Sequence, residues 1–241
     1  MANPLAQFEI KPIAEIQIGD FDASFTNSSA FMVLTVAAVT LFLVLSMRRR
    51  AIVPGRWQSM AELSYEFVAN MVRDNVGNEG RRYFPFIFSL FMFILFGNLI
   101  GLIPYAFTFT SHIIVTFAMA IVVFLGVTVI GFLRHGVHFL GFFVPKGVHP
   151  VMWILLIPIE VLSYLSRPVS LSIRLFANMM AGHTMLKVFA GFIIPLGILG
   201  GWAPLAMAVA LSGFEFLVAF LQAYVFTVLA CLYLNDAVHL H

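Results

Sequence analysis

Long apolar runs separated by short polar connections dominate the pattern of this chain. A polar segment, residues 1–29, precedes the first run at 30–47, two further runs form a hairpin over 83–133, and the last two fill most of 151–234. A helix that crosses a bilayer needs about 20 mostly apolar residues, whereas a barrel strand would alternate apolar and polar positions. The pattern therefore predicts an all-α integral membrane protein with about five membrane-embedded helices in one domain over 1–241.

Two stretches depart from a simple bundle of upright helices. Residues 57–77 mix polar and apolar positions, which predicts an amphipathic helix lying on the membrane surface. The last two apolar runs cover about 151–196 and 205–234, and both are longer than a perpendicular span requires. We therefore expect the last two helices to be strongly tilted.

The connection between the first run and the hairpin collects basic residues. They are Arg48, Arg49, Arg50, Arg56, Arg73, Arg81 and Arg82. Because connections rich in Lys and Arg remain on the inner side of a membrane, this stretch is expected inside. The polar N-terminal segment is then expected on the outer side.

Composition excludes several classes of function. The chain is 61% hydrophobic and only 10% charged, whereas soluble domains carry about 25% charged residues. A net charge of only +2 argues against a nucleic-acid partner, and the single Cys231 allows no internal disulfide. No histidine spacing predicts a metal site, and the chain has no Gly-rich phosphate loop. We expect no bound cofactor and no nucleotide chemistry in this chain.

Arg174 is the most informative charged residue, because it lies in the middle of an apolar helix. A guanidinium stays charged at any reachable pH, and placing one at bilayer depth costs at least about 2.5–3.5 kcal/mol. At roughly 100° per residue, Ser170, Asn178, Arg167 and Glu160 lie on the same side of the helix as Arg174. These residues form one polar stripe.

A second group of polar residues is predicted on the outer side of Arg174. If the last two helices run antiparallel and Gln222 lies level with Arg174, then His183 and Glu215 reach similar depths, roughly 10–14 Å toward the outer face. Glu160 lies about 21 Å away from Arg174 toward the inner face. Titratable groups on both sides of a permanent cation predict two half-paths separated by a barrier.

Each of these residues also has a purely structural interpretation. Polar side chains commonly join transmembrane helices, which would account for Gln222 and for a His183–Glu215 pair. Glu160 would then lie at the headgroup level, and Arg167 and Lys187 would extend their charged ends toward the two surfaces. Arg174 itself would be a structural residue. The remaining histidines are expected to be exposed at span ends and in connections.

Three stretches resemble one family. Ser-Arg-Pro-Val-Ser-Leu-Ser-Ile-Arg-Leu-Phe-Ala-Asn-Met at 166–179 is similar to the signature of subunit a of the rotary F-type ATP synthases. Phe-Leu-Gln-Ala-Tyr-Val-Phe at 220–226 and Gly-Asn-Leu-Ile-Gly-Leu-Ile-Pro at 97–104 resemble two further helices of that family, and 4–10 resembles its start. The resemblance covers nearly the whole chain.

The resemblance implies roles for the site residues. Arg174 would be the stator arginine that faces a carboxylate of the rotor, with Gln222, Asn178 and Ser170 along the proton route. Glu160 would lie at the inner half-channel. His183 and Glu215 would belong to the outer one, and a His after Ala-Gly resembles mitochondrial and alphaproteobacterial members.

The same resemblance implies partners and a location. The partners would be the c-ring of proton-carrying rotor subunits, the peripheral-stalk subunit b, the rest of the ATP synthase complex and membrane lipids. The location would be the bacterial inner membrane, with the mitochondrial inner membrane as the alternative. Two other functions remain open from the residues alone, a self-standing proton or cation channel or secondary transporter, and a structural membrane anchor. Sodium in place of protons is a narrower alternative.

Overall fold

Helices account for nearly all of the regular structure. The computed structural model describes residues 8–15, 17–18, 21–22, 24–48, 51–103, 106–143 and 150–239. Arg49, Arg50 and parts of the polar segment 1–29 lie outside the described residues. The helices are α1 (Asn27–Met47), α2 (Arg56–Val76), η2 (Asn78–Tyr83), α3 (Phe84–Gly101), η3 (Phe109–Ser111), α4 (Ile113–His135), η4 (Gly136–Phe143), α5 (Pro150–Ile193), α6 (Gly197–Gly200) and α7 (Trp202–Val238).

Five helical stretches are long and apolar enough to cross a membrane. They contain α1, η2 with α3, α4 with the start of η4, most of α5, and α7. The all-α membrane fold expected from the sequence is confirmed. The bounds shift by a few residues: α1 begins at Asn27 because the Thr26 hydroxyl caps it by accepting a hydrogen bond from Ser29 N, and α7 continues to Val238.

The polar N-terminal segment contains short strands that the apolar pattern does not reveal. They are β1 (Pro12–Ala14), β2 (Gln17–Ile18), β3 (Phe21–Asp22) and β4 (Phe25–Thr26), and they pair antiparallel as β1 with β4 and β2 with β3. Asn27 joins this segment to α1, since its N–H donates to Lys11 O at 3.0 Å and its side chain donates to Glu9 O at 3.0 Å. The segment is therefore held over the start of α1.

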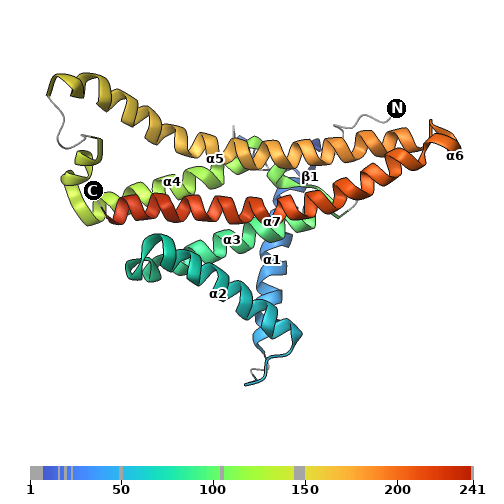
Figure 1. The fold of residues 1–241 in the computed structure, drawn as a ribbon, viewed down its shortest axis with the longest axis horizontal. Coiled ribbons are helices and arrows are strands. Elements are labelled where there is room, and N and C mark those ends of the chain that lie inside the picture. The colour runs from blue at the N-terminus through green and yellow to red at the C-terminus, as the bar shows by residue number, and fades with distance from the viewer. Residues whose placement is uncertain are drawn as a thin grey trace.

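The last two long helices form an antiparallel pair that runs along the length of the molecule (Figure 1). Helix α1 runs across the direction of this pair (Figure 1). If α1 stands upright in a bilayer, α5 and α7 are steeply inclined, which agrees with their length. The first part of α5 bends away from α7 (Figure 1), and Pro158 and Pro168 lie inside this helix. Proline removes a helical hydrogen bond and clashes with the preceding turn, which accounts for the bend.

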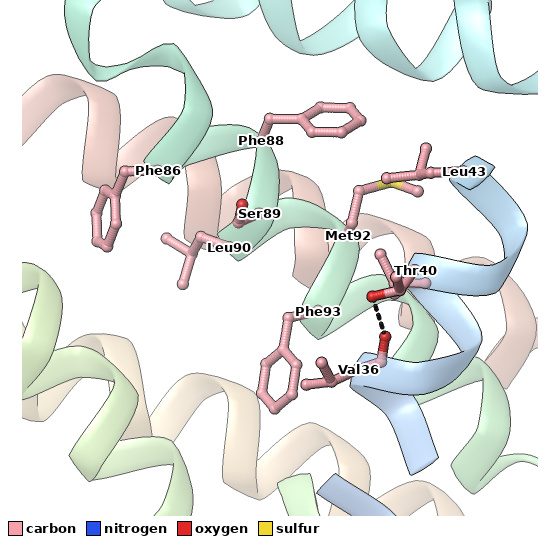
Figure 2. Close-up of a pocket in the computed structure, with 10 residues that line it drawn as sticks. Val36, Thr40, Leu43, Phe86, Phe88, Ser89, Leu90, Met92 and Phe93 are labelled. Carbon is pink, nitrogen blue, oxygen red and sulfur yellow. Dashed lines mark hydrogen bonds between the residues drawn. The ribbon is translucent and has the colours of Figure 1, made fainter. Parts of the chain in front are cut away.

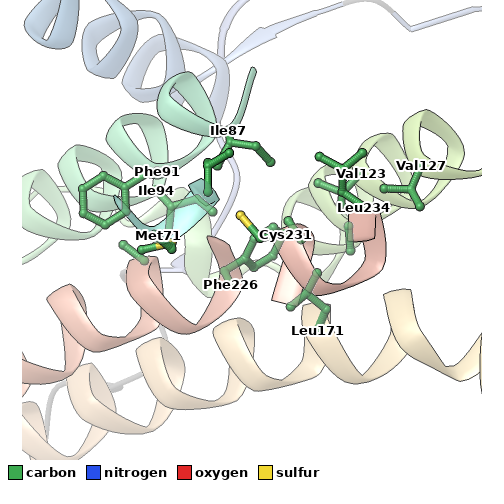
Figure 3. Close-up of a cluster of buried hydrophobic side chains, with 14 of the residues drawn as sticks. Met71, Ile87, Phe91, Ile94, Val123, Val127, Leu171, Phe226, Cys231 and Leu234 are labelled. Atoms are coloured by element: carbon green, nitrogen blue, oxygen red, sulfur yellow. The ribbon is translucent and has the colours of Figure 1, made fainter. Parts of the chain in front are cut away.

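The core lies where α7 is covered by α2, α3, α4 and α5. One face of α7 is fully buried and carries many small side chains, among them Ala219, Ala223, Ala230 and Cys231. Small residues let helix backbones approach closely in a membrane protein. Figure 3 shows Cys231 among larger apolar side chains such as Phe226 and Leu234. Cys231 is thus a packing residue.

The amphipathic stretch forms α2, one residue earlier at each end than the predicted 57–77. Its buried face includes Ala61, Val68, Val72 and Val76, which recur at helical spacing. This face packs against α3 and α7.

A cavity of about 420 Å³ lies between α1 and α3 (Figure 2). It is lined by Val36, Val39, Thr40, Leu43, Phe86, Phe88, Ser89, Leu90, Met92 and Phe93. The Thr40 hydroxyl donates to Val36 O within its own helix, so its polarity is satisfied locally. The lining has no ionisable side chain, and the charged residues that the sequence singles out lie elsewhere.

Candidate functional site

Arg174 lies on an exposed face of α5. A different face of this helix, about a quarter turn round the axis, is buried through Tyr164, Leu171, Leu175 and Met179. This spacing rotates Ser170, Arg174 and Asn178 to the exposed side, one turn apart from each other. Three residues of the expected polar stripe, Ser170, Arg174 and Asn178, are therefore exposed, whereas Arg167 and Glu160 of the same stripe are half-buried.

The two arginines of α5 have different surroundings. Nη1 of Arg167 donates to Oδ2 of Asp236 at 2.9 Å, and its guanidinium lies over the rings of Tyr164 and Tyr233. Arg167 thus connects α5 to the end of α7 and does not extend freely toward a surface. Across the described parts of the chain, Arg174 has no carboxylate within ion-pairing distance.

His183 and Glu215 meet between α5 and α7. Nδ1 of His183 lies 3.4 Å from Oε1 of Glu215, and only 4% of the Glu215 side chain is exposed. Neither carboxylate oxygen of Glu215 has a hydrogen-bond partner among the residues described. The two helices approach closely here because Gly182 has no side chain: a Cβ at this position would lie 2.7 Å from Oε1 of Glu215.

Thr108 completes the surroundings of His183. Its hydroxyl oxygen lies 3.0 Å from Nε2 of His183, and the hydroxyl donates to Gly101 O at 3.2 Å. Thr108 precedes η3, in the connection between α3 and α4. On the other side, the ring of Phe8 meets the imidazole edge-on. His183 is therefore contacted by the N-terminal segment, the α3–α4 connection and α7.

A cavity of about 870 Å³ leads to His183 from the N-terminal segment. Its polar lining residues include Glu9, Lys11, His183, Lys187 and Ser212. The His183 side chain is 11% exposed and Glu215 only 4%, so His183 is the partner nearer to this cavity. Water entering the cavity would meet the imidazole before the carboxylate.

Two contacts join α5 to α7, Arg167 with Asp236 and His183 with Glu215. They bracket Gln222, which is 7 residues from Glu215 and 14 residues from Asp236 along α7. The sequence-based assumption that Gln222 lies level with Arg174 stays a prediction. The Gln222 side chain is 9% exposed, on the same helix as Glu215.

Glu160 lies at the far end of the stripe. It precedes Arg174 by 14 residues, or about 21 Å along the helix axis, in the part of α5 that bends away from α7. The side chain is half-buried. The structure thus separates Glu160 from the His183–Glu215 pair, with Arg174 between them along α5.

Sequence reasoning missed two residues of this site and misjudged a third. The two missed residues are Thr108, which contacts His183, and Asp236, which pairs with Arg167. Both contacts join residues that are far apart in the sequence. His112 is not exposed as expected, since its ring stacks on Phe107 and is half-buried. Burial lowers the pKa of His112. No cluster of three or more potential metal ligands occurs within the described ranges.

The chain matches one protein family along most of its length. The family model described as ATP synthase A chain matches residues 29–235. The chain is 60% identical to ATP synthase subunit a of Paramagnetospirillum magneticum over 100% of both chains. It is 58% identical to ATP synthase subunit a of Pelagibacter ubique over 99% of this chain and 98% of the relative, and 56% identical to that of Rhodospirillum rubrum over 100% of both. Every site residue expected from the sequence lies within the matched range.

Proposed function

This chain belongs to the ATP synthase A chain family, and from that membership we propose that it provides two offset proton half-channels to a rotor ring, separated by Arg174. The family places the chain in the membrane sector of an ATP synthase complex, as a multi-pass membrane subunit with the proton-translocating stator role. The proposal adds which residues carry protons and which one faces the rotor.

The exposed, unpaired guanidinium of Arg174 is the observation that carries the proposal. A permanent charge in an apolar helix needs a counter-charge, and Arg167 has one in Asp236 whereas Arg174 has none among the described residues. Another chain that packs on the exposed face of α5 would supply this counter-charge. A carboxylate on each subunit of a c-ring would meet Arg174 in turn as the ring rotates.

The outer half-channel would begin at the cavity near the N-terminal segment. A proton entering there reaches His183 first and Glu215 next, because His183 is the more exposed of the two. From Glu215 the route would continue past Gln222 and Asn178 toward the rotor carboxylate. Ser170 and Glu160 lie on the other side of Arg174 and would belong to the inner half-channel.

Charge neutralisation would couple the proton to rotation. A rotor carboxylate that gains a proton can face lipid, whereas the charged form would be energetically unfavourable there. After nearly a full turn the carboxyl reaches the inner route near Glu160 and loses its proton. Arg174 attracts the new carboxylate, and its fixed positive charge prevents protons from passing directly between the two half-channels. A potential of 100 mV is worth about 2.3 kcal/mol per proton, so several protons are needed for each ATP.

Other subunits of the complex and membrane lipids would cover the exposed surfaces of this chain. The c-ring would cover the exposed face of α5, and a peripheral-stalk subunit b would hold the chain still against the ring. Membrane lipids would surround the remaining apolar surface. Since the bacterial relatives span the whole chain, the bacterial inner membrane is the proposed location.

Flux measurements on the chain alone and on the complex separate this function from a self-standing channel. In vesicles with an imposed pH difference, the purified chain is expected to pass protons at background rates, because half of the path belongs to the ring. Vesicles with the complete complex are expected to acidify when ATP is added. Rapid flux through the chain alone would support the channel, and an ATP-driven flux that requires sodium would overturn the choice of protons.

Gly182→Ala provides a second test of the outer half-channel. The new Cβ would push the Glu215 carboxylate away from His183, and we expect roughly a tenfold fall in ATP-driven acidification. Helix stability should not suffer, since alanine is favoured over glycine in a helix interior by about 1 kcal/mol. Gly191→Ala is the matched control, because a Cβ there meets nothing within 4 Å and the rate should stay unchanged. Equal rates for the two variants would contradict the role of the Glu215 position.

A further inference from the structure

We propose that Thr108 is a positioning residue that holds a hydrogen on Nε2 of His183 and so reserves Nδ1 for proton exchange with Glu215. The inference rests on the proposed proton path and adds a residue and a direction to it. The observation behind it is a three-membered chain of polar groups, from Gly101 O through the Thr108 hydroxyl to Nε2 of His183, with distances of 3.2 and 3.0 Å.

Hydrogen-bond counting decides which nitrogen carries the fixed hydrogen. A carbonyl oxygen only accepts, so the contact with Gly101 uses the one hydrogen of the Thr108 hydroxyl. The hydroxyl oxygen then has only lone pairs to offer to His183, and Nε2 must donate to it. A neutral imidazole with its hydrogen on Nε2 has a bare Nδ1, and that is the atom 3.4 Å from Oε1 of Glu215.

The Glu215 side supports the same assignment. Both of its carboxylate oxygens lack a hydrogen-bond partner within the described part of the chain, although its side chain is only 4% exposed. A buried acceptor without a partner is costly, and a proton shared with Nδ1 removes that cost. The distance of 3.4 Å is a few tenths of an ångström longer than a good N–H···O bond, and such contacts commonly tighten in the working state.

The proton step follows directly. In the imidazolium form, the Nδ1–H bond breaks and an Oε1–H bond forms, which leaves a neutral ring that keeps its hydrogen on Nε2 and a protonated Glu215. After Glu215 passes this proton toward the rotor, the next proton comes from the outer solution and reaches Nδ1 through water in the cavity. Thr108 remains an acceptor for Nε2 throughout, and its bond is stronger when the ring is charged.

Other charged groups lie around His183 but contact neither ring nitrogen by a hydrogen bond in the described ranges. Lys187 follows one turn later on α5, and Glu9 and Lys11 line the same cavity from the N-terminal segment. His112, in the α3–α4 connection, stacks on Phe107, which lines the same cavity. These groups change the local potential, whereas Thr108 and Glu215 are the partners at the two nitrogen atoms.

Substitution of the hydroxyl by a methyl group tests the proposal. Thr108→Val keeps the shape of the side chain, and Thr108→Ser keeps the hydroxyl. Thr110→Val is the matched control, because Thr110 is in the same connection, is fully buried, and has a hydroxyl without a hydrogen-bond partner among the described residues. The amount of assembled complex is measured for all three by ATP hydrolysis and by the quantity of this chain in the membrane.

The readout is ATP synthesis by inverted vesicles at a fixed membrane potential, while the pH of the lumen, which is the outer side, is varied. Thr108→Val is expected to lower the rate about tenfold at neutral lumen pH and to move the profile about one pH unit toward acid, because the charged ring loses its acceptor. Thr108→Ser should recover most of the rate, and Thr110→Val should match the unsubstituted complex.

Two results would overturn the proposal. The first is a Thr108→Val profile equal to that of the unsubstituted complex. The second is a Thr108→Ser variant as impaired as Thr108→Val, which would assign the effect to packing of the methyl group. Arg174→Ala in the same vesicles separates this inference from the proposed function: if that variant is inactive while Thr108→Val is normal, only the role of Thr108 fails.

Discussion

Arg174→Ala is expected to abolish ATP-driven proton pumping by the assembled complex while leaving the amount of complex in the membrane largely unchanged. The side chain lies on an exposed face of α5 and has no ion-pair partner in the described parts of the chain, so its removal breaks no salt bridge there. It does remove the counter-charge for a rotor carboxylate. Losing one partner of a desolvated charge pair costs about 3 kcal/mol or more, which is more than a hundredfold in rate.

The control for this prediction is the other arginine of the same helix. Arg167→Ala removes an identical side chain seven residues away, but it breaks the ion pair with Asp236 and the contacts with Tyr164 and Tyr233. This variant should reduce the amount of assembled complex, and the complex that does assemble should still pump. Pumping is measured by quenching of a pH-sensitive dye in inverted vesicles, normalised to the quantity of this chain. Normal pumping by Arg174→Ala would remove the central residue of the proposed mechanism.

The second large effect concerns the His183–Glu215 pair. Removing either group, as His183→Ala or Glu215→Ala, is expected to slow proton transport by about a hundredfold or more, because a positioned acid or base typically contributes a factor of that size to the rate. Exchanging the two, as His183→Glu with Glu215→His, should retain clearly more activity than either single removal. The exchange keeps one carboxyl and one imidazole across the same gap between α5 and α7.

The double removal is the reference for this experiment. All variants are compared in inverted vesicles by the initial rate of ATP-driven acidification, with ATP hydrolysis as the measure of assembly. An exchange variant as inactive as His183→Ala with Glu215→Ala would mean that the two residues do not share a proton. The pair would then be a structural contact between α5 and α7.

Most helices of this protein could be predicted from the order of apolar and polar residues. A run of 18 or more apolar residues has few alternatives to a membrane helix, because lipid offers no partner to an unpaired backbone group. The bounds were less accurate where a side-chain contact decides them, as at Thr26, which starts α1 three residues earlier than the apolar pattern indicates. The short strands β1 to β4 gave no pattern because two or three residues are too few to show alternation.

The candidate site could likewise be predicted only in part from the sequence. Helical spacing alone put Ser170, Arg174 and Asn178 on one face of α5, and the structure exposes that face. Spacing could not set the register between α5 and α7, so the level of Gln222 relative to Arg174 stays a prediction. Nor could it find Asp236 for Arg167 or Thr108 for His183, since 69 and 75 residues separate these partners.

The sequence by itself determined that this protein is a bundle of membrane helices and that one apolar helix carries an arginine in its middle. Both conclusions follow from local rules, because the length of an apolar run predicts a membrane helix and a charge within such a run is energetically unfavourable. Only the tertiary structure decided which charges are neutralised within the chain. Arg167 is paired, Arg174 is exposed, and His183 lies between a carboxylate and a hydroxyl because α5, α7 and the α3–α4 connection pack together. Such pairing depends on the relative positions of whole helices. Side-chain packing between helices sets these positions, and the local order of residues does not reveal them.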